Sequence, residues 1–400
     1  MKNKLFNTIF FLTIFLGTLL LSESSSYADT CHVDADGKVL IENHTDGSAT
    51  RPLGTDGRVL STDGGATYAA DGCTMEPLEY KVKMYKILLC TDDPYVAGGN
   101  APLLDSCIGE VMTNAAGKDV IIIPGEDTEI IEGDLELQLG RFKNLYFEGS
   151  SHLGIKHIVD FVKDEGGAFT LSGYKDHAAN FNSGSKCWTV KDKATTYNNV
   201  DEDSTDGLDG GKTPHNGQAF TQPTPTEPQS LSLTCGAAVN TTAGNEQEYG
   251  FAYEIIDSID ATCDASNDCH TTFNSFVNYE TIPETGDEGA FVLLQEDGTV
   301  ATDRRNATRI GYIVRFEDPL RIRETTIGFK MLFNTTSSVS VDVHLNDKGN
   351  GAGADDILEA KKVGANPFSV KIQTKKISSA GTWDEMWWSY VNFLHEIFFY

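Results

Sequence analysis

The sequence predicts an all-β protein with two antiparallel β-sandwich-like domains, a short N-terminal hairpin region and a C-terminal amphipathic helix. Two observations predict this class. Apolar residues alternate with polar ones over many short stretches, and a period of two is what a strand with one buried face requires. Gly and Asp punctuate these stretches at short intervals, and this spacing of short strands favours a sandwich.

The strongest pattern lies between Ile310 and Leu345, where three alternating apolar runs follow one another with short polar breaks. The runs are Ile310, Tyr312, Val314 and Phe316, then Ile327, Phe329, Met331 and Phe333, then Val339, Val341, Val343 and Leu345. Successive strands with short connections predict an antiparallel meander that forms one wall of a sandwich or barrel.

Composition divides the chain into six segments. They are an export signal (1–28), a Gly/Asp-rich hairpin region (29–75), a first β-sandwich-like domain (76–199), an acidic and Pro-rich linker or loop (200–230), a second β-sandwich-like domain (231–378) and an aromatic amphipathic tail (379–400). A length of 400 residues agrees with more than one domain.

The first segment has the three parts of an export signal. Lys2 and Lys4 precede the apolar stretch Leu5–Leu21, and Ser26-Tyr27-Ala28 offers small residues for cleavage before Asp29. An uncleaved anchor is the alternative. No later stretch is apolar enough to span a bilayer. We therefore expect a secreted, extracellular or cell-surface protein, and the periplasm stays open as a location.

Local turn and bulge signals occur in each folded part. Asp36-Gly-Lys-Val-Leu recurs as Asp56-Gly-Arg-Val-Leu, and Asp-Gly pairs favour tight turns, so two small hairpins are expected. Asp297-Gly298 predicts another hairpin turn. The alternation within Leu78–Met84 slips by one residue at Tyr85, which predicts a β-bulge.

All eight cysteines follow the signal segment, and an even number in an exported chain predicts disulfides. The preferred pairing is sequential: Cys31–Cys73, Cys90–Cys107, Cys187–Cys235 and Cys263–Cys269. The adjacent Cys–His pairs leave a metal site as an alternative, although the CxxC spacing typical of zinc is absent.

The chain is strongly acidic, with Lys+Arg 31 against Asp+Glu 59, so 31 − 59 = −28. Such a surface repels nucleic acid and anionic lipid, which excludes both as expected partners. It suits divalent cations, and calcium is the candidate cofactor because oxygen ligands gather in one Gly-containing loop. The candidate ligands are Asp201, Asp203, Asp206 and Asp209. A solvated acidic loop is the alternative.

The tail differs from the rest of the chain, because its apolar residues recur at helical spacing and many are aromatic. The proposed interaction residues are Trp383, Trp387, Tyr390, Leu394 and Phe398. An exposed aromatic patch usually marks a contact site, whereas packing on the second domain is the alternative.

No catalytic motif supports an enzyme, because GxSxG and HExxH are both absent. A pair of carboxylates for glycoside cleavage stays open as an alternative, because such a pair forms in space and acidic residues are abundant. We expect a structural or adhesive protein that contacts other surface proteins or copies of itself. The alternative is a secreted calcium-dependent carbohydrate-binding module or hydrolase with a polysaccharide partner. Its candidate aromatic residues are Trp188, Trp383, Trp387 and Trp388.

Overall fold

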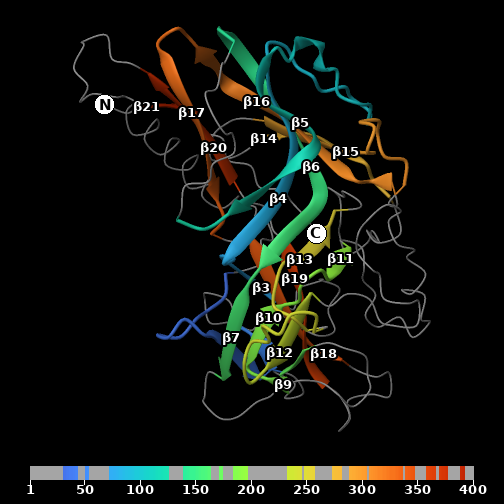
Figure 1. The fold of residues 1–400 in the computed structure, drawn as a ribbon, viewed down its shortest axis with the longest axis vertical. Coiled ribbons are helices and arrows are strands. Elements are labelled where there is room, and N and C mark those ends of the chain that lie inside the picture. Colours follow the sequence, from blue (N-terminus) through green and yellow to red (C-terminus); the bar gives the residue numbers. More distant parts are fainter. Residues whose placement is uncertain are drawn as a thin grey trace, which may run out of the picture.

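A computed structural model gives the fold (Figure 1). It describes residues 30–43, 50–53, 72–125, 138–163, 171–173, 183–196, 232–245, 247–256, 273–281, 288–303, 306–336, 338–346, 357–365, 369–376 and 388–391. Within these ranges the chain forms strands β1 to β21 and one 3-10 helix, η1 (Leu104–Ser106). The all-β prediction is therefore confirmed.

The largest sheet has eight strands, and the long strand β6 lies at its centre. The strands are β4 (Glu79–Cys90), β5 (Gly109–Ile122), β6 (Gly140–Lys156), β11 (Ala194–Thr196), β13 (Ala252–Ile255), β14 (Phe276–Thr281), β15 (Glu288–Leu294) and β16 (Arg309–Ile322). One edge of β6 pairs with β4. The other edge pairs with β16 along its first half and with β13 along its second half.

Three smaller sheets complete the described fold. One contains β1 (Val39–Asn43), β2 (Thr50–Pro52), β7 (Ile158–Lys163), β10 (Lys186–Thr189) and β12 (Leu233–Gly236). Another contains β3 (Gly72–Met75), β8 (Leu171–Gly173), β9 (Ser183–Gly184), β18 (Val339–Asn346) and β19 (Ile357–Ala365). The third contains β17 (Thr326–Asn334), β20 (Ser369–Lys376) and β21 (Trp388–Val391). Most pairs are antiparallel, but β1–β7, β8–β19 and β11–β13 are parallel.

The three runs between Ile310 and Leu345 do form strands, β16, β17 and β18. The predicted meander is wrong, however, because these strands lie in three different sheets. β16 pairs with β6 and β15, β17 with β20, and β18 with β3 and β19. Alternation specifies which face of a strand is buried, but it does not specify the neighbouring strand.

Strand pairing crosses the segment that the sequence predicts to be a linker. β6, from the first expected domain, pairs with β13 and β16, which come from the second. β3, from the N-terminal hairpin region, pairs with β18. The largest sheet therefore takes strands from both expected domains.

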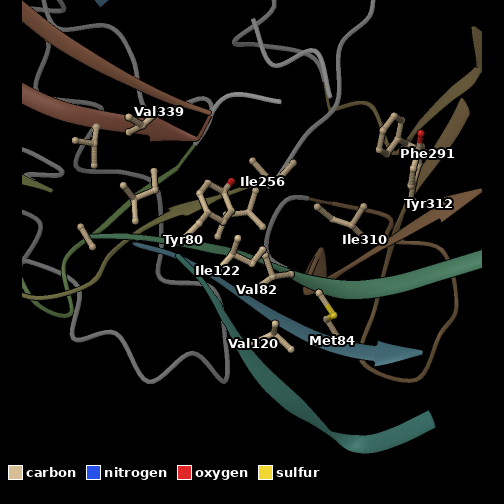
Figure 2. Close-up of a cluster of buried hydrophobic side chains, with 14 of the residues drawn as sticks. Tyr80, Val82, Met84, Val120, Ile122, Ile256, Phe291, Ile310, Tyr312 and Val339 are labelled. Carbon is tan, nitrogen blue, oxygen red and sulfur yellow. The ribbon is translucent and has the colours of Figure 1, made fainter. Parts of the chain in front are cut away.

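The main hydrophobic core is likewise one cluster, to which the eight-stranded sheet and both five-stranded sheets contribute. Figure 2 shows Tyr80, Val82 and Met84 of β4 among side chains that include Ile122 and Ile256. Burying one large apolar side chain contributes about 1.5–3 kcal/mol, so a shared core couples the sheets energetically.

The predicted irregularity in β4 is confirmed, because its register with both β5 and β6 shifts between Met84 and Lys86. Tyr80, Val82 and Met84 are buried, as their alternation indicates. Leu78 is the exception, since it precedes the strand and is 47% exposed.

Two of the predicted turns are present. At the first, Gly37 has a φ of 78°, and Asp34 accepts hydrogen bonds from the backbone N–H groups of Asp36 and Lys38. At the second, Gly298 has a φ of 84°, and Thr299 donates its backbone N–H to Asp297. The hairpin at Asp56 lies outside the described residues.

Three of the four predicted disulfides are confirmed: Cys31–Cys73, Cys90–Cys107 and Cys187–Cys235. The third joins residues that are direct partners in the register of β10 and β12. Cys263 and Cys269 lie outside the described residues.

The tail prediction requires a correction. Trp388–Val391 forms β21, which pairs antiparallel with β20, so the predicted amphipathic helix is wrong over these residues. Pairing with β20 outweighs the local helical spacing of apolar residues. The remaining tail positions lie outside the described residues. In the part of the chain that the structure describes, no helix is long and apolar enough to cross a membrane.

Candidate functional site

An aromatic–lysine face lies on the eight-stranded sheet and is the best candidate for a contact site. We define it by three aromatic and two basic residues, Tyr249, Phe251, Tyr253, Lys81 and Lys156. Lys81 lies on β4, Lys156 ends β6, Tyr253 lies on β13, and the other two aromatic residues immediately precede β13. All five side chains are half-buried, so each is partly accessible to a ligand.

The strand register brings these residues together. Tyr253 is the partner of Gly154 on β6, and Gly154 is in turn the partner of Lys81 on β4. A Cβ atom at Gly154 would lie 2.9 Å from the Cβ of Lys81 and 3.1 Å from a ring carbon of Tyr253. Glycine therefore leaves the space in which the lysine and the aromatic rings meet.

Each lysine ammonium lies near two aromatic rings. Lys81 Nζ is 5.8 Å from the ring centroid of Phe251 and 5.9 Å from that of Tyr253. Lys156 Nζ is 5.3 Å from the ring centroid of Tyr249 and 5.8 Å from that of Phe251. Phe251 thus lies between the two cations. These distances approach the outer limit of cation–π attraction, so each contact is weak.

Carboxylates balance the lysines of the face. Lys81 lies 2.9 Å from Asp119, and Lys156 forms an ion pair with Glu79. Burial lowers the pKa of Lys81, but the hydrogen bond to Asp119 and the attraction of nearby groups raise it by more, so the net shift is upward. Burial and the charge of Glu79 raise the pKa of Tyr249. At neutral pH Lys81 is therefore charged and Tyr249 is neutral.

This arrangement suits binding. Aromatic residues are enriched in contact surfaces because they offer a large apolar area with few rotatable bonds. The lysines add hydrogen-bond donors, the carboxylates add acceptors, and the Tyr253 hydroxyl accepts a bond of 3.4 Å from Lys81. Ile121, the register partner of Lys81, extends the face and is 43% exposed.

A second polar cluster surrounds the buried carboxylate of Glu148, which is 1% exposed. Lys86 Nζ lies 2.7 Å from one of its oxygens, and Arg309 lies 2.6 Å from the other. Tyr146 also donates its hydroxyl, at 3.0 Å. Burial raises the pKa of Glu148, but the bonds from Lys86 and Arg309 lower it further than burial raises it. Both oxygens are bonded, so this cluster supports the fold.

A third cluster ties the Cys90–Cys107 loop to the sheet. Arg315 lies 2.6 Å from Asp93, pairs with Glu288, and covers the ring of Tyr279 at 4.0 Å. Tyr279 donates its hydroxyl to Asp93 at 2.7 Å. Burial, the hydrogen bond to Asp93 and its charge raise the pKa of Tyr279 well above its usual range. The cluster positions the loop over the second, smaller core.

The structure describes only some of the site residues predicted from the sequence. Trp188 is fully buried and donates its ring N–H to the backbone of Gln247 at 2.9 Å, so it cannot stack on a sugar. Tyr390 lies in β21. The remaining proposed tail and calcium residues are not among the described ones: Trp383, Trp387, Leu394 and Phe398, and Asp201, Asp203, Asp206 and Asp209. The described ranges contain no group of three His, Cys, Asp or Glu residues that could hold a metal.

Sequence reasoning missed the aromatic–lysine face. The alternation of aromatic residues at 249, 251 and 253 with Gly250 and Ala252 is a period-two signal that could have indicated one aromatic face. The lysines could not be assigned to it, because Lys81 and Tyr253 lie 172 positions apart. No family model, curated protein or solved structure matches the chain.

Proposed function

We propose that this chain is an adhesive or structural protein of the extracellular space or cell surface, and that the aromatic–lysine face makes its contact. Three disulfides are compatible with an oxidising compartment outside the cytosol. The export signal expected at residues 1–28 agrees with this location.

The observation that carries the proposal is the partial exposure of three neighbouring aromatic side chains on one face of the eight-stranded sheet. Tyr249, Phe251 and Tyr253 are half-buried, although the core of the same sheet buries other aromatic side chains fully. Exposed aromatic groups that lie together usually mark an interaction site. A contact surface on strands loses little conformational entropy on binding, because the backbone is already ordered.

A bead assay tests the adhesive role. Beads coated with the full chain are expected to cluster, and bacteria that export the chain are expected to retain it on their surface in fractionation. The double variant F251A/Y253A should weaken both effects about tenfold if these rings are binding hot spots. Tyr95→Ala is the matched control, since Tyr95 is a half-buried tyrosine of the disulfide loop.

A truncated variant that ends at residue 382 tests the proposed contact role of the tail in the same bead assay. Beads that stay dispersed when coated with the complete chain, together with complete release of the exported chain into the medium, would contradict the adhesive role. Equal clustering by F251A/Y253A and by the unmodified chain would show that the aromatic–lysine face does not contribute to adhesion.

We propose calcium as a cofactor of the acidic segment that contains Asp201, Asp203, Asp206 and Asp209. Hard oxygen ligands close together in a Gly-containing segment are what calcium coordination requires. If calcium binds the folded chain, free calcium at about 100 times the dissociation constant should add about 2.7 kcal/mol to the free energy of unfolding. Urea denaturation with calcium and with chelator measures this difference, and it should vanish in D201N/D203N. Identical curves for the unmodified chain would disprove the site.

A further inference from the structure

We propose that the aromatic–lysine face binds a neutral glycan chain. This inference rests on the proposed contact role of the face and names the class of ligand. The face combines flat apolar rings with closely spaced hydrogen-bond donors and acceptors. A sugar ring needs this combination, because its C–H groups form an apolar face while its hydroxyls lie around the rim.

The rings supply the apolar half of the site. Phe251 lies near both lysine ammonium groups, Tyr253 lies near that of Lys81 and Tyr249 near that of Lys156, so the three rings gather around the same two lysines. Phe251 lies between the other two and carries no polar group of its own. Three neighbouring rings suit an extended ligand, which contacts several rings at once.

The charged residues supply the polar half. Sugar hydroxyls both donate and accept hydrogen bonds. Lys81 and Lys156 are donors, and their partners Asp119 and Glu79 are acceptors. The Tyr253 hydroxyl lies within 3.4 Å of Lys81 Nζ, so it belongs to the same network. A hydroxyl that enters between a lysine and its carboxylate finds both kinds of partner.

A ligand that stacks on the rings displaces the lysine ammonium groups that lie over them. These ammonium groups lie 5.3–5.9 Å from the ring centroids, near the limit at which cation–π attraction is significant. The long lysine side chains are 23% and 26% exposed and can rotate. Moving an ammonium aside therefore costs little, and its ion pair with Asp119 or Glu79 stays within reach.

Charge selects a neutral ligand over an acidic one. The two lysines are matched by two carboxylates, so the face has no large surplus of positive charge. The chain as a whole carries a formal charge of −28. This field repels an approaching polyanion and leaves an uncharged chain unaffected.

Retention on insoluble polysaccharides tests the proposal with the full-length chain. The panel contains cellulose, chitin and β-1,3-glucan as neutral glycans, and cross-linked alginate as the acidic one. The chain should bind at least one neutral glycan and should bind alginate weakly. Phe251→Ala and Tyr253→Ala should each weaken retention about tenfold, as expected for a ring at a contact centre. Tyr95→Ala should bind as the unmodified chain does.

Two further variants keep the test independent of folding defects. Tyr253→Phe and Lys156→Gln preserve most of the packing and remove one polar group each, so they should weaken retention two- to fivefold, roughly the effect of one hydrogen bond. Thermal unfolding of every variant shows that the fold is retained.

Each other outcome overturns the proposal. Failure to bind any neutral glycan excludes the ligand class, and equal binding by Phe251→Ala places the site elsewhere. Tighter binding to alginate than to the neutral glycans reverses the charge argument. If beads cluster through this face but no glycan is retained, the adhesive role stands and the glycan inference fails, with a protein surface as the partner.

Discussion

Replacing Glu148 with alanine is expected to lower the free energy of unfolding by about 3–5 kcal/mol. The carboxylate is 1% exposed and accepts bonds from Lys86, Arg309 and Tyr146. Its removal leaves two cations without their shared anion in a partly dry environment, because the Arg309 side chain is only 13% exposed. An uncompensated buried charge costs far more than the intact pair contributes.

Urea denaturation at pH 7 measures the effect of Glu148→Ala. Lys143→Gln is the matched control, because Lys143 and its partner Asp92 are 57% and 75% exposed. Loss of an exposed ion pair should change stability by less than about 1 kcal/mol. The loss of stability in Glu148→Gln should lie between those of Glu148→Ala and Lys143→Gln, since the amide keeps the shape of the carboxylate and part of its hydrogen bonding. An unfolding curve for Glu148→Ala that matches the control would show that this network does not stabilise the fold.

The second large effect is a loss of stability in weak acid caused by His157. Its side chain is 3% exposed, and burial lowers its pKa from 6.5 to about 4. Nε2 lies 3.1 Å from the Sδ of Met75, and Nδ1 has no hydrogen-bond partner within the described ranges. The residue lies between β6 and β7, where the chain passes from the largest sheet into a smaller one.

The sign of this effect follows from the two pKa values. Above pH 6.5 the imidazole is neutral in both the folded and the unfolded chain, so it does not lower the free energy of unfolding there. As the pH falls from 6.5 towards 4, the unfolded chain binds a proton that the folded chain does not. The free energy of unfolding should therefore fall by up to about 3 kcal/mol over this range.

Comparison of the unmodified chain with His157→Leu isolates the contribution of His157 to the pH dependence of stability, because the other titrating groups are common to both. Urea denaturation at pH 7.5 and at pH 4.5 should show a smaller acid-induced loss in His157→Leu, by about 2–3 kcal/mol. Val159→Ala, at a buried position on β7 that carries no titrating side chain, should keep the acid sensitivity of the unmodified chain. If His157→Leu loses as much stability as the unmodified chain does, the histidine is not the acid-sensitive group.

The sequence predicted local features where neighbouring residues set the conformation. The alternation within β16 marked a real strand, and Ile310, Tyr312, Val314 and Phe316 are all buried. Asp297-Gly298 forms the expected turn, because glycine adopts the positive φ that the turn requires. These successes share one cause: each depends on residues a few positions apart.

Long-range pairing explains the failures. β18 pairs with β3, which lies more than 260 positions earlier in the chain. Neither segment contains a sequence pattern that indicates the other as its partner. The register of a strand pair depends on core packing and on backbone hydrogen bonds that any strand can offer. At the tail, Trp388–Val391 pairs with β20 as a strand, although the spacing of its apolar residues favours a helix.

The sequence by itself determined that the chain is built of strands with one buried face, because period-two burial is a local property. It also favoured the three cysteine pairs that form, but eight cysteines allow many pairings, and only the fold brings the two members of each pair together. Only the tertiary structure decided that β6 lies between strands from both halves of the chain. That arrangement places Lys81 beside Tyr253 and Lys86 beside Glu148. Side chains so far apart in sequence meet only when a sheet is assembled, because register across the strands sets their distance.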